Sequence, residues 1–188
     1  KYKDTWDVWE RKRFLVSPDG APCTGELKRI PGEEIWNYGD VEVFGFTAEE
    51  AARLERWKRN NEERKISAPL IDLNLTKSDC LAILDRAGIE LPTLYKLGFR
   101  NNNCIPCVKA RDSVDYWKRI RKHFPQEFRR MAKLERELGY NLNRVSVKGE
   151  KVDIYLDEIE PGDPIGRDPD IQCGLFCQSE IEEIADCA

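Results

Sequence analysis

Several features that would mark common functional classes are missing from this sequence. It has no apolar run of about 18 residues, so no membrane-spanning helix is predicted. Asp and Glu outnumber Lys and Arg by 35 to 31, and the net charge of −4 gives no general basic surface for nucleic acid. No apolar segment follows the charged first residues, so no secretory signal peptide is predicted. The single histidine, His123, lies near the end of a predicted helix, where an end-of-helix role is favoured over catalysis.

What the sequence does contain is typical of a folded domain. Of its 188 residues, 40% are hydrophobic and 35% are charged, a composition that supports a core beneath a charged surface. The length suits one domain, or one domain with a small appendage. Seven cysteines without a secretion signal point to a reducing compartment. We therefore expect a cytoplasmic protein with metal or thiol chemistry rather than disulfides.

Four of these cysteines fall in two close pairs. Cys104 and Cys107 form a Cys-x2-Cys pair in the polar, turn-prone segment 101–107, and Cys173 and Cys177 form a Cys-x3-Cys pair near the C-terminus. Four thiolates hold a tetrahedral zinc ion or a [4Fe–4S] cluster. The spacing therefore predicts a shared zinc or cluster site that closes the intervening span as a domain. Two alternatives remain: buried or disulfide-bonded cysteines, and redox or nucleophilic chemistry at Cys173.

A candidate anion site lies near the N-terminus. Residues 4–14 are predicted to be helical, and a turn at residues 18–20 follows. We expect Thr24 to cap a short helix that carries Leu27 and Lys28. Free N–H groups at such a helix end, with a lysine nearby, suit a phosphate or a sulfate. The same residues also occur as an ordinary turn and cap without a ligand.

The middle of the chain has the pattern of an α/β protein. Residues 41–46 are predicted to be a strand that is apolar on both faces, which is typical of a sheet covered on both sides. Thr47 and Glu50 form a capping box for a helix that runs to about Asn61, so strand and helix make a βα unit. Residues 66–72 are predicted to be a loop or an edge strand because a proline interrupts them.

The remaining elements are mainly helices whose ends are marked by capping residues, proline and glycine. Helices are predicted over residues 76–88, 92–97, 112–123 and 125–138, with a last short one from Ser179. Residues 144–147 and 152–156 are predicted to form a β-hairpin.

Six segments, taken in order, resemble one known family. They are residues 13–15, 22–28, 43–50, 75–80, 98–104 and 173–177. In these segments the chain resembles the phosphoadenosine phosphosulfate reductase-like family of the adenine nucleotide alpha-hydrolase (PP-loop) superfamily. The likeness is strongest to its small members from phages and mobile bacterial elements. Because the segments extend over nearly the whole chain, the match is more specific than any one motif.

The resemblance implies a Rossmann-like α/β layer sandwich that binds an adenine nucleotide such as ATP, phosphoadenosine phosphosulfate or adenosine phosphosulfate. It also implies that Arg13 and Lys28, with the turn at Cys23 and Thr24, contact the phosphate or sulfate end of that ligand. Fixed cations near a helix N-terminus are suited to a polyanion.

The chain departs from the family pattern in two places. The superfamily's phosphate loop, a Ser-Gly-Gly-x-Asp-Ser type segment, is absent, so we expect a fragment, or a half whose partner chain supplies the loop. Sulfonucleotide reductases carry a C-terminal Glu-Cys-Gly-Leu-His segment, whereas residues 172–176 are Gln-Cys-Gly-Leu-Phe. The loss of the carboxylate and imidazole, together with the extra Cys177, favours Cys173 as a metal ligand over a redox nucleophile.

Functions of different classes remain open. In the first, residues 1–98 are the C-terminal part of a nucleotide-binding α/β domain, and residues 99–188 are a helical and hairpin region closed by the four-cysteine site. Together they would be part of an enzyme with sulfur or adenylyl chemistry. In the second, a zinc-stapled module without catalysis binds protein or nucleic acid. Its expected contacts are Trp117, Lys118, Arg121 and Lys122. A nucleotide-activating enzyme that modifies nucleic acid would join the two, on family context alone.

Overall fold

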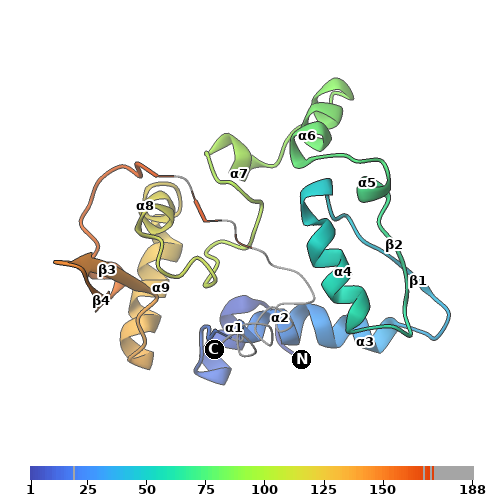
Figure 1. The fold of residues 1–188 in the computed structure, drawn as a ribbon. Helices are drawn as coiled ribbons and strands as arrows, with labels where there is room; N and C mark the ends of the chain where they lie inside the picture. The colour runs from blue at the N-terminus through green and yellow to red at the C-terminus, as the bar shows by residue number, and fades with distance from the viewer. Residues whose placement is uncertain (19, 167, 170, 172–188) are drawn as a thin grey trace. The chain divides into compact units, whose positions relative to one another are not determined.

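The structure is a computed structural model that describes residues 1–18, 20–166, 168–169 and 171 (Figure 1). The described residues divide into two compact units. Residues 1–29 and 92–171 belong to the first unit, and residues 30–91 form the second. This division differs from the sequence-based boundary at residue 98, because the N-terminal helices pack with the later ones.

Most of the regular secondary structure in the first unit is helical. Its helical elements are α1 (Thr5–Lys12), α2 (Pro22–Thr24), a π-helical turn (Gly25–Arg29), α7 (Thr93–Lys96), α8 (Val114–His123), α9 (Pro125–Leu138) and a 3-10 turn (Leu156–Glu158). Strands β3 (Asn143–Val147) and β4 (Glu150–Ile154) pair antiparallel, which confirms the predicted hairpin. The ends of α9 also follow the prediction, because Pro125 starts the helix and Gly139 ends it with a left-handed φ of 65°.

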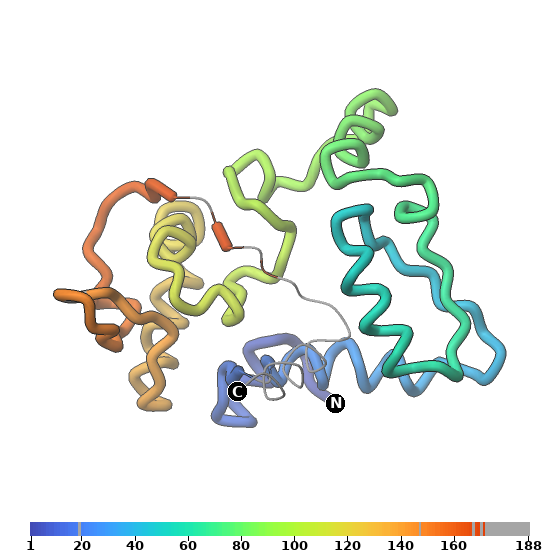
Figure 2. The backbone as a smooth tube through the Cα atoms, viewed as in Figure 1, coloured from blue at the N-terminus to red at the C-terminus, as the bar shows by residue number. Residues whose placement is uncertain are grey.

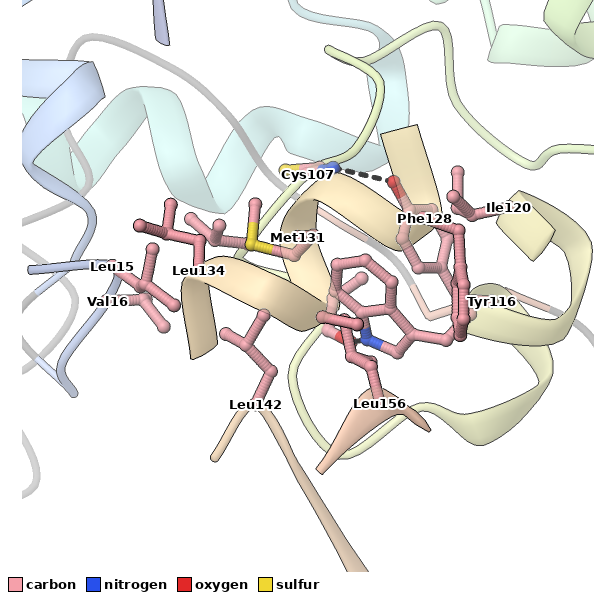
Figure 3. Packing of buried hydrophobic residues seen from close by; sticks show 14 of the residues in the cluster. Leu15, Val16, Cys107, Tyr116, Ile120, Phe128, Met131, Leu134, Leu142 and Leu156 are labelled. Carbon is pink, nitrogen blue, oxygen red and sulfur yellow. Dashed lines mark hydrogen bonds between the residues drawn. The ribbon is translucent and has the colours of Figure 1, made fainter. Parts of the chain in front are cut away.

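The core of the first unit lies around α8 and α9 (Figure 3). Trp117 and Ile120 of α8 and Met131 of α9 are each 0% exposed. We call residues 99–108, which carry the first cysteine pair, the cysteine loop. This loop contributes Phe99, Cys107 and Val108 to the core, and Leu156 packs there from the segment after the hairpin. The cluster also includes Leu15, Val16, Leu134 and Leu142. Burying a side chain of this size stabilises a fold by about 1.5–3 kcal/mol, so the core fixes the loop that carries the first cysteine pair.

The second unit is built on a short strand–helix–strand motif. Its elements are α3 (Ile30–Ile35), β1 (Val41–Val43), a 3-10 turn (Ala48–Glu50), α4 (Ala51–Arg59), β2 (Lys65–Ser67), α5 (Pro69–Asp72) and α6 (Lys77–Arg86). Strands β1 and β2 pair in parallel, with α4 between them along the chain. The capping box of Thr47 and Glu50 ahead of α4 is confirmed. The predicted βα unit is therefore present.

The strand in this motif is shorter than predicted and is open on one face. Phe44 and Phe46 stack with ring centroids 5.2 Å apart, and Phe44 contacts Trp57 of α4 at 5.0 Å. On the opposite face, Val41 is 56% exposed and Val43 is 69% exposed. The expectation of a strand covered on both sides is therefore wrong here, because the described residues place a helix against one face only.

The mixture of helices and strands is compatible with the α/β class. The described strands form two sheets of two strands each, so the larger layer sandwich stays a prediction. The segment at residues 66–72 contains the end of β2 followed by α5, which Pro69 begins at its first position. No helix in the described part of the chain has the length and apolar character that crossing a membrane requires.

Candidate metal centre

The first cysteine pair lies in a loop that is anchored at one side. Cys107 is 6% exposed and belongs to the core, whereas Cys104 is exposed, and neither forms a disulfide. The backbone N–H of Cys107 donates a hydrogen bond of 2.7 Å to the hydroxyl of Tyr116 on α8 (Figure 3). This contact holds the loop against α8 while leaving Cys104 accessible to a metal.

Tyr116 is itself part of the core beneath the loop. Its side chain is 2% exposed, and burial raises the pKa of its hydroxyl well above the usual value. The group therefore stays protonated at neutral pH. Because its oxygen accepts the Cys107 N–H, its own proton remains to be donated to another acceptor.

A long segment after the hairpin returns along α8 toward the cysteine loop. We call the described residues of this stretch, 159–166, 168–169 and 171, the return segment (Figure 2). Arg121 donates to the carbonyl oxygens of Ile159 at 2.8 Å and Leu156 at 3.0 Å. Farther along, Lys122 pairs with Asp163 at 2.7 Å, and the Asp115 carboxylate accepts the N–H of Ile165 at 2.8 Å. Side chains of α8 thus fix the path of this segment.

The end of the return segment lies beside the first cysteine pair. The Asp168 carboxylate accepts hydrogen bonds from Arg119 Nε at 3.1 Å and from the Arg100 backbone N–H at 3.3 Å. The side-chain amide of Asn103 donates to the Ile171 carbonyl oxygen at 3.1 Å. Ile171, the last residue that the structure describes, therefore lies beside the residue that precedes Cys104.

The complete four-cysteine site extends beyond the described residues. Cys173 and Cys177 lie outside them, and the short helix predicted from Ser179 does too. Among the residues that the structure describes, no three potential metal-binding side chains come together. Cys104 and Cys107 therefore supply half of the predicted ligand set, and the shared site stays a prediction.

The residues present fit a thiolate-bound group. Neither Cys104 nor Cys107 is consumed by a disulfide. Cysteine sulfur is a common ligand of structural zinc and of iron–sulfur clusters, and a close pair offers two ligands from one loop. The donor set on the described side is thus compatible with either zinc or a cluster.

The four residues expected at the nucleotide lie in the N-terminal part of the first unit. Arg13 ends α1 in a left-handed conformation with φ of 51°, and its guanidinium donates to the Glu137 carbonyl oxygen at 3.1 Å. Cys23 packs against the core, and Lys28 is an exposed residue of the π-helical turn. Their role in nucleotide binding stays a prediction.

Thr24 does not cap a helix as expected. Helix α2 begins at Pro22, with Ala21 as its N-cap residue and no side-chain cap. Thr24 lies inside the helix, is 4% exposed, and donates its N–H to the Ala21 carbonyl oxygen at 3.0 Å. The prediction was wrong because Pro22, whose fixed φ suits the first position of a helix, starts the helix earlier.

A cavity lies next to the cysteine loop. Its volume is about 440 Å³, and it is lined by Gly98, Arg100, Arg119, Gly166 and Asp168. Ligand pockets commonly fall between about 300 and 1,000 Å³. The Asp168 carboxylate and Gly166 carbonyl oxygen already engage Arg119, so the guanidinium that lines this cavity is held in place.

The contact surface expected for a binding module is not built as predicted. Trp117 is 0% exposed in the core, so it is not available as a surface contact. Arg121 and Lys122 bind the return segment instead. His123 ends α8, as predicted, near the ring of Phe99, and burial lowers its pKa. The basic run of α8 is therefore largely used within the protein.

Sequence reasoning missed several buried polar residues. Asp168 is 5% exposed and pairs with Arg119, 49 residues away, a separation that gives no local signal. Glu135 is 0% exposed on α9. It lies four residues after Met131, on the apolar stripe of that helix, and a charge on such a stripe was the signal that could have identified it.

No protein-family profile, curated protein or solved structure matches this chain. The family resemblance of its motifs accordingly stays a prediction.

Proposed function

We propose that this chain is part of a phosphoadenosine phosphosulfate reductase-like PP-loop enzyme with a four-thiolate centre. Cys104, Cys107, Cys173 and Cys177 would hold a zinc ion or a [4Fe–4S] cluster. The observation that carries the proposal is the hydrogen bond of 3.1 Å from Asn103 to the Ile171 carbonyl oxygen. It joins the residue before the first cysteine pair to a residue shortly before the second.

Residues that are not metal ligands support such a centre by holding the cysteine loop and the return segment in place. The core holds Cys107, and α8 directs the return segment toward the loop through Asp115, Arg119 and Arg121. Zinc would supply a rigid clasp between the two thiol pairs, whereas a cluster would add redox capacity. A reducing cytoplasm would keep the thiols available for either group.

The proposed substrate is an adenine nucleotide, either a sulfonucleotide or ATP. Its phosphate or sulfate end would meet Arg13, Cys23, Thr24 and Lys28, in keeping with the resemblance. The open face of β1, with Val41 and Val43 exposed, suits further α/β structure, because parallel sheets are normally covered on both faces. A partner chain that supplies the phosphate loop would fulfil this requirement.

Metal analysis of anaerobically purified protein tests the four-thiolate centre. We expect about one zinc ion or one cluster per chain, since four thiolates complete one site. A brown protein with broad visible absorbance indicates a cluster, and a colourless zinc-loaded protein indicates zinc. Cys104→Ser and Cys173→Ser should each remove the metal, while Cys80→Ser, on α6 of the other unit, should not. Metal-free wild-type protein, or a Cys173→Ser variant that still binds normally, contradicts the proposal.

Calorimetry with adenine nucleotides separates the enzyme from a zinc-stapled binding module for protein or nucleic acid. Lys28→Ala should weaken nucleotide binding about 10- to 150-fold, since a hydrogen bond to a charged group contributes about 1.5–3 kcal/mol. Lys133→Ala, on the exposed face of α9, is the matched control. Absent nucleotide binding combined with salt-sensitive binding of nucleic acid would favour the module instead.

A further inference from the structure

The two members of the first cysteine pair differ in accessibility. Cys104 is exposed, whereas Cys107 is buried in the core of the first unit. Neither forms a disulfide, and only two residues separate them along the chain. In such a pair the accessible sulfur can react with a disulfide from outside, and the shielded sulfur can then displace the product.

The path of the cysteine loop suits a bond between these two sulfurs. The backbone bends at Ile105 and Pro106, between the two cysteines. An extended chain would place their Cα atoms roughly 10 Å apart. A disulfide needs a Cα separation of about 4.4–6.8 Å, so a bend at this place is required. Burial raises the pKa of the Tyr116 hydroxyl, and the charges of Cys107 and Cys104 raise it further, so both sulfurs lie near this one group.

Helix α8 fixes the inner half of the pair. The backbone N–H of Cys107 donates to the Tyr116 hydroxyl at 2.7 Å. Trp117 Nε1 donates to the carbonyl oxygen of Ala110 at 3.1 Å, three residues farther along. The chain after the second cysteine is therefore held against the helix, while the thiol of Cys104 faces solvent. This difference gives the two cysteines separate roles.

We propose that Cys104 and Cys107 form a thiol–disulfide exchange site for low-molecular-weight disulfides. The Cys104 thiolate attacks one sulfur of the substrate, the S–S bond breaks, and the first thiolate leaves. The Cys107 thiol then loses its proton and attacks the Cys104 sulfur, which releases the second thiolate. The protein gains one disulfide, and the substrate takes up two electrons. The two protons lost by the cysteines are taken up by the two released thiolates through solvent.

This activity goes beyond the proposed four-thiolate centre and does not depend on it. Only Cys104 and Cys107 take part, and both belong to the described part of the chain. A sulfur that is bonded in a disulfide no longer serves as a thiolate ligand, so a bound metal and this disulfide exclude each other. We therefore expect the exchange in the metal-free protein.

The test is incubation of the reduced, chelator-treated full chain with glutathione disulfide, followed by peptide mapping with mass spectrometry. In wild type, the peptide that contains both cysteines should lose two hydrogens, which shows a bond between Cys104 and Cys107. Cys107→Ser should instead keep one glutathionyl group on Cys104, because no second thiol displaces it. Cys104→Ser should gain none on Cys107, because that sulfur is shielded. Cys80→Ser, on α6 of the other unit, is the control and should behave as wild type.

Several results would overturn the exchange site. They are wild-type protein in which Cys104 stays unmodified, keeps its glutathionyl group or bonds to a cysteine other than Cys107, and a Cys107→Ser variant without an adduct on Cys104. An adduct on Cys107 in the Cys104→Ser variant would overturn the assigned roles. If circular dichroism shows that Cys107→Ser is unfolded, Cys107→Ala replaces it, and the wild-type peptide map remains decisive.

Metal analysis separates this inference from the proposed function. A chain that binds a metal but forms no bond between Cys104 and Cys107 after chelation would overturn the exchange site and leave the four-thiolate centre standing. A chain that binds no metal but forms this bond would have the opposite meaning.

Discussion

The carboxylate of Glu135 is the most deeply buried charge-bearing side chain described in the molecule. It is 0% exposed, and its two oxygens accept the backbone N–H groups of Leu142 at 2.6 Å and Leu156 at 2.7 Å. These residues lie on the two sides of the β3–β4 hairpin, so a single side chain of α9 ties both ends of the hairpin to the helix. Burial raises the pKa of Glu135 from 4.5 to about 7, against the two N–H donors, which lower it.

This pKa predicts a pH dependence of stability. Between pH 4.5 and about 7, Glu135 binds a proton in the folded protein but not in the unfolded chain. Its contribution to the free energy of unfolding is therefore fully present below pH 4.5 and is lost as pH rises through about 7. We expect wild type to lose on the order of 2 kcal/mol relative to Glu135→Gln over this range, measured by urea unfolding at several pH values.

The control for this prediction is Glu137→Gln, an exposed position on the same helix. It should keep the wild-type pH profile. The nearby charges of Arg136 and Asp157 are present in all three proteins and cancel in the comparison. Parallel pH profiles for wild type and Glu135→Gln would show that the buried carboxylate does not titrate in this range. Below pH 4.5, where the wild-type contribution is fully present, the amide variant should be less stable than wild type by about 1–3 kcal/mol, because its NH2 group faces an N–H donor.

At the scale of elements, the helices were the most predictable part of the chain. Their ends are marked locally: Thr76 and Asp79 form the capping box of α6, and Pro125 and Gly139 bound α9. These signals depend on neighbouring residues only. The apolar spacing of Trp117 and Ile120 likewise indicated the buried face of α8 without knowledge of its partner.

Features that depend on distant residues were not predictable in the same way. The helix N-terminus expected at Thr24 lies earlier because Pro22 competes for the first position. The strand at residues 41–46 is limited by the length of its partner, β2, which no local pattern specifies. The basic residues of α8 looked like a surface for a partner, yet the return segment occupies Arg121 and Lys122.

The packing of the return segment against α8 leads to a prediction about Gly166. A Cβ atom on Gly166 would lie 2.5 Å from the Asp115 carboxylate oxygen, which is too close for that side chain to stay in place. Asp115 would have to move, and its hydrogen bond with the Ile165 N–H would be lost. We expect Gly166→Ala to destabilise the protein by about 1–2 kcal/mol in urea unfolding.

Ile165→Ala provides the matched control on the neighbouring residue. The Ile165 side chain is 94% exposed, so its truncation should change stability by less than about 0.5 kcal/mol. Equal stabilities of Gly166→Ala and Ile165→Ala would mean that the return segment does not pack against Asp115.

At the scale of the whole molecule, hydrogen bonds join segments that lie far apart in the sequence. The hydrogen bond between Asn103 and Ile171 spans 68 residues, as does the one between Arg100 and Asp168. Cysteine spacing predicted that these regions would meet, but it could not identify the helix that brings them together. That information lies in α8, whose charged side chains have partners only once the fold has formed.

If the proposed metal centre is present, the division into two compact units predicts that removal of the metal acts on one of them. The first unit has its own core around Trp117 and contains the cysteine loop, whereas the second has a separate core around Trp57. A bound metal stabilises the folded state that binds it. Structural zinc sites contribute far more than the roughly 1.4 kcal/mol that changes an equilibrium constant tenfold. In hydrogen exchange read by mass spectrometry, chelation should therefore accelerate exchange about tenfold or more in peptides from residues 99–123 and 156–169. Peptides from residues 41–59 should exchange as before.

A Cys104→Ser, Cys173→Ser double variant should reproduce the chelated pattern and show no further response to chelator. Uniform acceleration across both units would mean that they unfold as one, and no response in the first unit would mean that no metal holds its cysteine pairs together.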